Sequence, residues 1–279
     1  MKKGGFMMTR VGVLGCGAIG TEMAMIIDRG EIDGAELVSL YDQDEKKLTH
    51  IQGKISDRVQ QFSDFQEFLS TEGMDLVIEC AAPKAVRMLG PEILGARLSL
   101  LMLSSGALAD SEFFKKISKI AEENESKLIV PSGALGGVDA IRAVRHLLKE
   151  VVLTSTKPPR GLIGAPGFQE WEAVDFVEPR IIFEGNALQA IQAFPANVNV
   201  GVTLSLAGIG PEKTKVKVVA DPKAPGNVHE IFARGDFGVF RFRLENKPHI
   251  TNPRTSYLAI LSAIEALKSI CGVGPRIGT

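Results

Sequence analysis

The strongest constraint on the fold is a glycine-rich turn that separates a short apolar strand from a helix. Residues 11–14 predict a buried strand and residues 18–28 a helix, while residues 37–41 predict a second strand that ends at Asp42. This order of strand, turn, helix and acid is typical of a dinucleotide-binding βαβ unit. A glycine-rich turn without that context would indicate only a structural turn.

The three glycines of the turn have separate uses in such a unit. Gly15 allows the tight turn, Gly17 lets backbone N–H groups approach a pyrophosphate, and Gly20 lets helix and strand pack closely. Ala18 and Ile19 open the helix, whose first amides carry the positive end of the helix dipole. We therefore expect a pyrophosphate to bind at these five residues.

Asp42 indicates which dinucleotide is bound. It follows Gly20 by 22 residues, a distance at which a carboxylate can accept hydrogen bonds from the adenosine ribose hydroxyls. A 2′-phosphate would meet the negative charge of Asp42, so the sequence favours NAD. Gln43 and Lys46 could weaken this preference, which leaves NADP as the alternative cofactor.

The first half of the chain continues this alternation of strands and helices to about residue 130. Apolar runs predict strands at 74–82, 99–104 and 127–130, with helices at 84–94 and 111–124 between them. Such alternation predicts an α/β fold with a Rossmann-type doubly wound parallel sheet. Ala81 and Ala82 follow one of these strands and leave room for a ribose or a nicotinamide.

The second half has a different pattern and predicts an α+β domain with a mixed sheet. We expect a dinucleotide-binding domain at 1–132, a substrate-binding and dimerisation domain at 133–251, and a return of 252–279 to the first domain. The predicted helices are 138–149, 186–193, 197–206 and 255–270, and the strands are 151–156, 180–183, 213–220, 228–234 and 237–244.

Composition excludes several classes of partner and location. The 279 residues include 32 basic and 33 acidic side chains, a net charge of −1, so no global field attracts nucleic acid or a membrane surface. Three cysteines that are far apart predict neither a disulfide framework nor a metal cluster, and indicate reduced thiols in a cytoplasm. Residues 1–8 lack the apolar core of a secretory signal, and no run reaches the roughly 18–20 apolar residues that span a bilayer.

Three groups of segments together resemble the L-aspartate dehydrogenase family. They are residues 131–140 (PSGALGGVDA), 194–200 (FPANVNV) with 203–208 (TLSLAG), and 220–222 (ADP) with 227–230 (NVHE). The resemblance implies an oxidoreductase that converts L-aspartate to iminoaspartate with NAD or NADP, after which the imine hydrolyses to oxaloacetate and ammonia. In that family iminoaspartate can also feed quinolinate and hence NAD synthesis.

The resemblance also implies roles for single residues. The catalytic histidine of the family matches His229, and its nicotinamide contacts match Ala134 and Asn199. An imidazole titrates near neutral pH, so it can take a proton from the substrate ammonium and later activate water. Glu230 and Asp221 are nearby in sequence as orienting acids. Without the family motif an isolated histidine would more simply be structural, and His249 is the second candidate.

A dicarboxylate substrate requires cations or aligned N–H donors. Lys157 and Arg160 flank two prolines and are candidates for a substrate carboxylate, although a solvated turn explains them equally well. Asn197 and Asn199 lie at a predicted helix start, where one can cap the helix and the other bind. Further donors at predicted strand ends are Ser105 and Ser132.

Two other functions fit the two-domain plan. One is a reductase of another small carbonyl or imine, similar to homoserine dehydrogenase or dihydrodipicolinate reductase. The other is a non-catalytic NAD-binding sensor, which would keep the glycines but have no use for His229. The apolar sheet of the second domain needs cover on one face, which predicts a homodimer.

Overall fold

The computed structural model describes residues 8–195, 199–250 and 255–272, which form two compact units. The first unit comprises the described residues up to Ala107, Glu112–Pro131 and those from Ala263 on, and the second comprises Leu108–Ser111 and Ser132–Ser262. Each unit has its own sheet, so each is described by itself.

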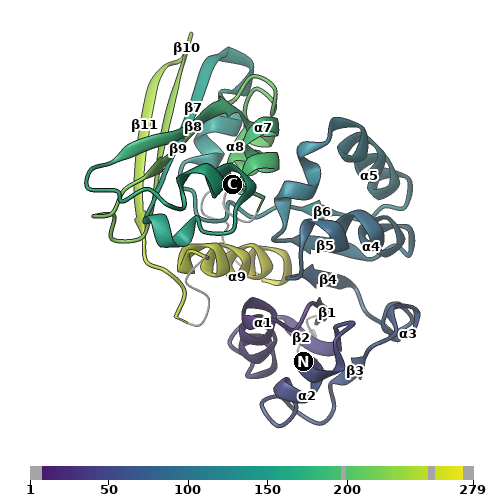
Figure 1. The fold of residues 1–279 in the computed structure, drawn as a ribbon. Coiled ribbons are helices and arrows are strands. Elements are labelled where there is room, and N and C mark those ends of the chain that lie inside the picture. The colour runs from purple at the N-terminus through teal and green to yellow at the C-terminus, as the bar shows by residue number, and fades with distance from the viewer. Residues whose placement is uncertain (1–7, 196–198, 251–254, 273–279) are drawn as a thin grey trace. The chain divides into compact units, whose positions relative to one another are not determined.

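The first unit is built on a six-stranded parallel sheet with the strand order β3-β2-β1-β4-β5-β6 (Figure 1). This is the strand order of a dinucleotide-binding doubly wound fold, in which ligands bind beyond the carboxyl ends of the strands where the order reverses, here between β1 and β4. The strands are β1 (Thr9–Leu14), β2 (Ala35–Tyr41), β3 (Gln60–Phe62), β4 (Leu76–Glu79), β5 (Ser99–Met102) and β6 (Leu128–Ile129).

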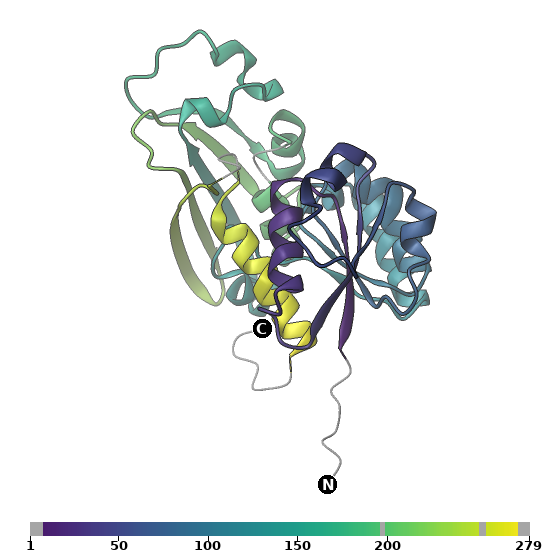
Figure 2. The same ribbon diagram turned by 90° about the horizontal axis from the view of Figure 1, so that it is seen from below.

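Helices cover both faces of this sheet, with α1 on one face and α4 and α5 on the other (Figure 2). Apolar strands covered on both sides explain why β1 and β4 are fully buried from Val11 to Leu14 and from Leu76 to Glu79. The helices are α1 (Ala18–Asp28), α2 (Glu45–Ile51), α3 (Phe65–Leu69), α4 (Pro83–Gly95) and α5 (Ser111–Glu123), with a 3₁₀ turn η1 (Ser105–Ala109).

The second unit contains a five-stranded mixed sheet with the order β11-β10-β7-β9-β8. Strands β7 and β9 pair in parallel and the other neighbours pair antiparallel. The strands are β7 (Leu148–Lys157), β8 (Arg180–Asn186), β9 (Lys215–Ala220), β10 (Asn227–Gly235) and β11 (Gly238–Asn246). Its helices are α6 (Val138–Ala143), α7 (Ala187–Ala193) and α8 (Asn199–Ala207), with 3₁₀ turns η2 (Arg145–Leu147), η3 (Pro159–Gly161) and η4 (Pro166–Trp171). The predicted Rossmann-type sheet and mixed second sheet are both confirmed.

The helix predicted over 138–149 begins at Val138 as expected, but its predicted end is wrong, because α6 ends at Ala143 and the chain enters β7 at Leu148. Strand β7 is the central strand of the second sheet, paired with β10 on one side and β9 on the other. Residues 145–147 still form the 3₁₀ turn η2, and only residues 148 and 149 of the predicted helix are strand, where tertiary pairing outweighs local propensity. The three-residue edge strand β3 was not predicted, because its sequence is too short to show a period.

The C-terminal helix α9 (Tyr257–Cys271) is divided between the units, with its residues up to Ser262 in the second and from Ala263 in the first. Its last turn packs against the turn at Gly34, where an added Cβ would lie 2.6 Å from the Cys271 carbonyl oxygen. Gly34 has φ +81°, so this close approach depends on glycine. Among the described residues, no helix has the length and apolar character needed to cross a membrane.

Candidate active site

The glycine-rich turn after β1 has the close packing that its sequence predicts. Gly15 has φ +96°, and a Cβ there would lie 2.9 Å from the backbone of Ala81 and Cys80. A Cβ on Gly20 would lie 1.7 Å from the Gly15 carbonyl oxygen, so helix α1 and the turn touch through bare backbone. A Cβ on Gly17 would meet nothing within 4 Å. The space beside Gly17 at the start of α1 is therefore open, as the binding of a pyrophosphate at a helix N-terminus requires.

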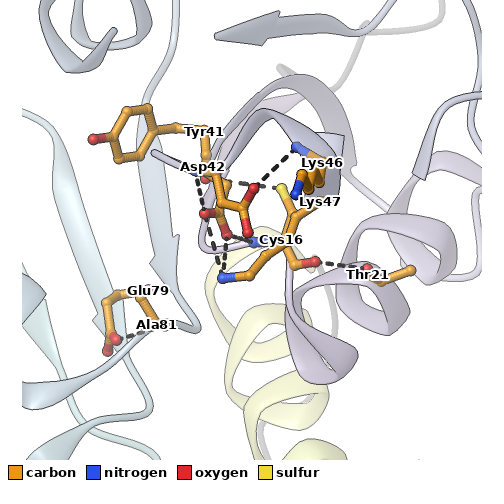
Figure 3. Close-up of polar contacts among 9 residues, drawn as sticks. Cys16, Thr21, Tyr41, Asp42, Lys46, Lys47, Glu79 and Ala81 are labelled. Atoms are coloured by element: carbon orange, nitrogen blue, oxygen red, sulfur yellow. Dashed lines mark hydrogen bonds and ion pairs between the residues drawn. The ribbon is translucent and has the colours of Figure 1, made fainter. Parts of the chain in front are cut away.

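Asp42, at the end of β2, is held against this turn (Figure 3). Its Oδ2 accepts a hydrogen bond from the backbone N of Cys16 at 2.8 Å, and its Oδ1 accepts one from the backbone N of Asp44 at 3.0 Å. The side chain is 5% exposed. The carboxylate is thus fixed beside the glycine turn, as a ribose-binding acid requires.

The cation beside Asp42 is Lys47, and not the predicted Lys46. Lys47 Nζ lies 3.2 Å from Asp42 Oδ2, whereas the backbone N of Lys46 donates to Oδ1 of Asp44, whose side chain caps α2 (Figure 3). Helix α2 starts at Glu45, which places residue 47 within reach of the acid. A half-exposed ammonium therefore offsets part of the negative charge that a 2′-phosphate would meet.

Glu79 is a buried acid that the sequence reading missed. It ends β4, is 1% exposed, and accepts hydrogen bonds from Ala81 N at 2.8 Å, Ser104 N at 3.0 Å and Ser104 Oγ at 2.8 Å. The pKa of Glu79 is raised overall, because the effect of burial exceeds the opposing effect of its hydrogen bonds with Ser104 and Ala81. Figure 3 shows its contact with Ala81. The bonds with Ser104 extend the carboxylate's contacts from the loop after β4 to the loop after β5, at the edge of the sheet where ligands bind. The sequence offered one indication of this role, since Glu79 is the only acid in the apolar run Leu76–Glu79 and ends it.

The remaining predicted residues of the first unit differ in exposure. Ala81 and Ala82 are exposed at the end of β4, open to a ligand, whereas Ser105 is buried in η1. Burial and the Asp42 charge raise the pKa of Cys16 to about 12, and burial raises that of Cys80. Both thiols stay protonated, which gives neither the reactivity of a thiolate.

In the second unit, the candidate residues lie on the helix-covered face of the sheet, arranged in rows across the strands. Far from the site these rows are apolar; one of them consists of Phe242, Ile231, Leu153 and Val216 in β11, β10, β7 and β9. Two residues further along β7 is the histidine row: Leu244, His229, Ser155 and Val218. Directly opposed residues share a face, so the core becomes polar at this end.

The next row, here the lysine row, consists of Asn246, Asn227, Lys157 and Ala220. Lys157 Nζ donates to Asn227 Oδ1 at 2.9 Å, and Asn227 Nδ2 donates to Ser256 Oγ at 3.0 Å. Asn246 Nδ2 donates to the Ala134 carbonyl at 3.2 Å. The row thereby connects Lys157 with the predicted nicotinamide contact.

Lys157 is buried in β7, which rules out a solvated turn. It is 3% exposed, and desolvation lowers its pKa to about 8. Its hydrogen-bond partner is the neutral amide of Asn227, so within the described part of the chain the buried ammonium lacks a counter-charge. The site therefore favours an anionic ligand.

His229 is 2% exposed, and its Nδ1 is a buried atom without a hydrogen-bond partner among the described residues, as is Ser155 Oγ. Each such atom costs about 1–3 kcal/mol of stability. Burial, and secondarily the Lys157 cation, lower the pKa of His229 to about 3. The imidazole is therefore neutral at pH 7 and able to accept a proton.

The predicted orienting acids do not contact His229. Glu230 follows His229 in β10 and so points to the opposite face, where it pairs with Arg243 at 2.9 Å. Asp221 accepts from the backbone N of Lys223. The residue opposite His229 is Ser155, which the sequence reading missed because the pairing joins residues 74 positions apart.

Other candidates lie elsewhere or outside the described residues. Arg160 is exposed, Ser132 is half-buried before α6, and Asn199 is the first residue of α8. Asn197 lies outside the described residues. His249 is buried near Tyr257, with ring centroids 5.9 Å apart. Within the described ranges, no group of three or more His, Cys, Asp or Glu residues could hold a metal ion.

Each half of the chain matches a known protein family model. Residues 139–270 match the family model described as aspartate dehydrogenase, C-terminal, and residues 15–131 match that described as homoserine dehydrogenase, NAD binding domain. A crystal structure of aspartate dehydrogenase from Thermotoga maritima superposes with a TM-score of 0.76 at 26% identity, covering 96% of this chain and 99% of that one. Scyllo-inositol dehydrogenase from Lactobacillus casei, at 14% identity and a TM-score of 0.59, shares the fold alone.

Curated relatives extend the match over nearly the whole sequence. L-aspartate dehydrogenase of Nitrosopumilus maritimus is 37% identical over 274 residues, which are 98% of this chain and 100% of the relative. L-aspartate dehydrogenase of Methanosarcina barkeri is 45% identical over 268 residues, which are 94% of this chain and 97% of the relative. At this identity and coverage, the chain belongs to the L-aspartate dehydrogenase family.

Proposed function

We propose that the chain oxidises L-aspartate to iminoaspartate with NAD, or with NADP as the alternative cofactor, and that the imine hydrolyses to oxaloacetate and ammonia. The observation that carries this proposal is the lysine row beside the histidine row. A buried cation without a counter-charge and a neutral, buried imidazole lie together at the end of an otherwise apolar core. Membership of the L-aspartate dehydrogenase family indicates that the substrate is L-aspartate.

The dinucleotide is held by the first unit. Gly15, Gly17 and Gly20, with the amides of Ala18 and Ile19, hold the pyrophosphate, and Asp42 holds the adenosine ribose. Within this unit, Ala81 and Ala82 are the proposed contacts of the ribose or nicotinamide. The family resemblance separately proposes Ala134 and Asn199 as nicotinamide contacts. When bound, the nicotinamide supplies the acceptor for the hydride that leaves the substrate Cα.

Lys157 binds a carboxylate of the substrate. Its ammonium has three N–H donors, one of which is used by Asn227. The substrate anion supplies the missing counter-charge, and a charge-assisted hydrogen bond in a buried site is strong. Asn227 and Ser256 fix the direction of the ammonium. Ser105, Ser132 and Asn197 remain candidates for the second carboxylate.

His229 acts as the base. The substrate ammonium must lose a proton before hydride can leave Cα, and the imidazole accepts it. The low pKa of His229 belongs to a site without substrate: a bound dicarboxylate neutralises Lys157 and adds negative charge, which raises the pKa of the imidazole toward the working range. After it has released the substrate's proton to solvent, the same imidazole can take a proton from the water that attacks the imine.

The direct test is the initial rate of NADH or NADPH formation with L-aspartate, measured with NAD and NADP in parallel. L-homoserine serves as the competing substrate, because the first-domain family model also describes homoserine dehydrogenase. Turnover of L-aspartate alone supports the proposal. Turnover of homoserine alone, or tight NADH binding without turnover of either, would replace it with the reductase or the sensor.

We further propose a homodimer that forms through the open face of the second sheet. Val152, Val219 and Phe232 point away from the helices and are half-buried within one chain. Size-exclusion chromatography with light scattering tests this proposal, and a monomer at micromolar concentration rejects it. A cytoplasmic location, and transfer of iminoaspartate to a quinolinate-forming enzyme, are further predictions of the family assignment.

A further inference from the structure

The histidine row contains two buried polar atoms that lack partners, and they lie directly opposite each other. His229 in β10 pairs in register with Ser155 in β7, and the outer neighbours in the row, Leu244 and Val218, are apolar. His229 Nδ1 and Ser155 Oγ are both sealed from solvent and form no hydrogen bond with any residue that the structure describes. Ser155 lies in the central strand of the sheet, a position otherwise suited to an aliphatic side chain such as that of Leu153.

The distance across the row allows these two atoms to meet. Directly opposed residues of antiparallel strands have Cβ atoms about 4.5–5.5 Å apart. Oγ is one bond from Cβ in serine and Nδ1 is two bonds from Cβ in histidine, so rotation about the side-chain bonds brings them to hydrogen-bond distance. A hydroxyl can accept a hydrogen bond from the ring N–H, and buried polar groups generally find such a partner.

We propose that Ser155 is a positioning residue for His229: its hydroxyl accepts a hydrogen bond from Nδ1–H and so fixes the tautomer in which Nε2 is the unprotonated base. In a neutral imidazole one nitrogen carries the proton and the other is free. Nδ1 is sealed from solvent, so under this proposal Nε2 is the nitrogen that meets the substrate. This role rests on the proposed function of His229 and replaces the acid that commonly orients a catalytic histidine.

The tautomer can be measured without any turnover. Nitrogen-15 NMR of histidine-labelled protein at pH 8, where a pKa of about 3 leaves His229 neutral, distinguishes the two tautomers. The His229 signal is identified by its loss in His229→Asn. We expect wild type to show protonated Nδ1, and Ser155→Ala to shift the population toward protonated Nε2. Protonated Nε2 in wild type would overturn the proposal.

Kinetics provide the second readout. We expect Ser155→Ala to lower kcat for L-aspartate about 10- to 100-fold, because an orienting partner is lost, with little change in KM or in NADH affinity. Thr154→Ala is the matched control, since Thr154 is the preceding residue of β7 and points to the opposite face. An unchanged kcat in Ser155→Ala, or an equal loss in Thr154→Ala, contradicts the role. A protein with the expected tautomer but no aspartate turnover would instead reject the proposed function and leave the pairing intact.

Discussion

The nucleotide turn and the sheet rows are built from the chain in opposite ways. The turn at residues 15–20 and Asp42 lie within one βαβ unit, so contacts between near neighbours in sequence assemble them. The lysine and histidine rows bring residues 155–157, 227–229 and 246 together through strand register. Binding of a common cofactor therefore depends on a local motif, whereas substrate chemistry depends on the long-range pairing of three strands.

Replacement of His229 separates the two regions most sharply. His229→Asn should lower kcat with L-aspartate about 10²- to 10⁴-fold, the usual worth of a general base, and leave NADH affinity within about twofold. Steady-state kinetics and NADH fluorescence titration measure both. His146→Asn, an exposed histidine of the same unit, is the control and should change neither. Loss of NADH affinity together with kcat would show that the two regions are not independent.

Lys157 should affect binding of the substrate anion and nothing in the nucleotide turn. Lys157→Met should raise the inhibition constant of succinate about 10- to 100-fold, as expected for loss of a hydrogen bond to a charged group. Lys149→Met, an exposed lysine of the same strand whose ion pair with Asp236 lies on the surface, is the matched control. An unchanged constant in Lys157→Met would remove Lys157 from the substrate site.

The same cation predicts a pH dependence with a definite sign. The pKa of Lys157 is lowered from 10.5 to about 8, so its charge is present below pH 8 and is lost above it. Succinate remains a dianion over that range, and its inhibition constant should be flat up to about pH 7.5 and then rise about tenfold per pH unit. In Lys157→Arg the cation persists, and the rise should disappear.

Substitutions at two glycines test whether the glycine-rich turn binds the dinucleotide or only stabilises the fold. A Cβ on Gly17 meets open space, so Gly17→Ala should fold normally but place a methyl group where the pyrophosphate approaches, lowering NADH affinity about tenfold. A Cβ on Gly20 collides with the Gly15 carbonyl, so Gly20→Ala should lower the free energy of unfolding by about 1–3 kcal/mol or more. Thermal unfolding and NADH titration distinguish them. Equal destabilisation by both would indicate that Gly17 is structural.

The sequence predicted the first unit well because its signals are local. The glycine turn, α1 and Asp42 lie where spacing placed them, and α1 begins and ends at the predicted residues. The start of β7 was misplaced, because residues 148–150 suit a helix in isolation and are strand only where β10 pairs with them, whereas the predicted strand over 151–156 lies within β7. The same register hides Ser155 and makes Glu230 look adjacent to His229, although alternate residues of a strand face opposite sides. The family resemblance predicted His229 as the catalytic histidine, which stays a prediction, and only the strand pairing of the structure shows which residues surround it.

The smallest expected effect is that of the Asp42–Lys47 pair on the choice between NAD and NADP. It tests whether residues near the glycine turn alone determine this choice. Lys47 lies 3.2 Å from Asp42 but is half-exposed, so solvent screens its charge. Lys47→Ala should lower kcat/KM for NADP about two- to fivefold, because the full charge of Asp42 then opposes a 2′-phosphate, and should leave kcat/KM for NAD nearly unchanged. Lys46→Ala is the control, since Lys46 contacts Asp44 only through its backbone N among the described contacts. A lower kcat/KM for NADP in Lys46→Ala, with no change in Lys47→Ala, would mean that Lys46 contacts the 2′-phosphate, as the sequence alone indicated. The Asp42–Lys47 pair would then have no part in the choice of cofactor.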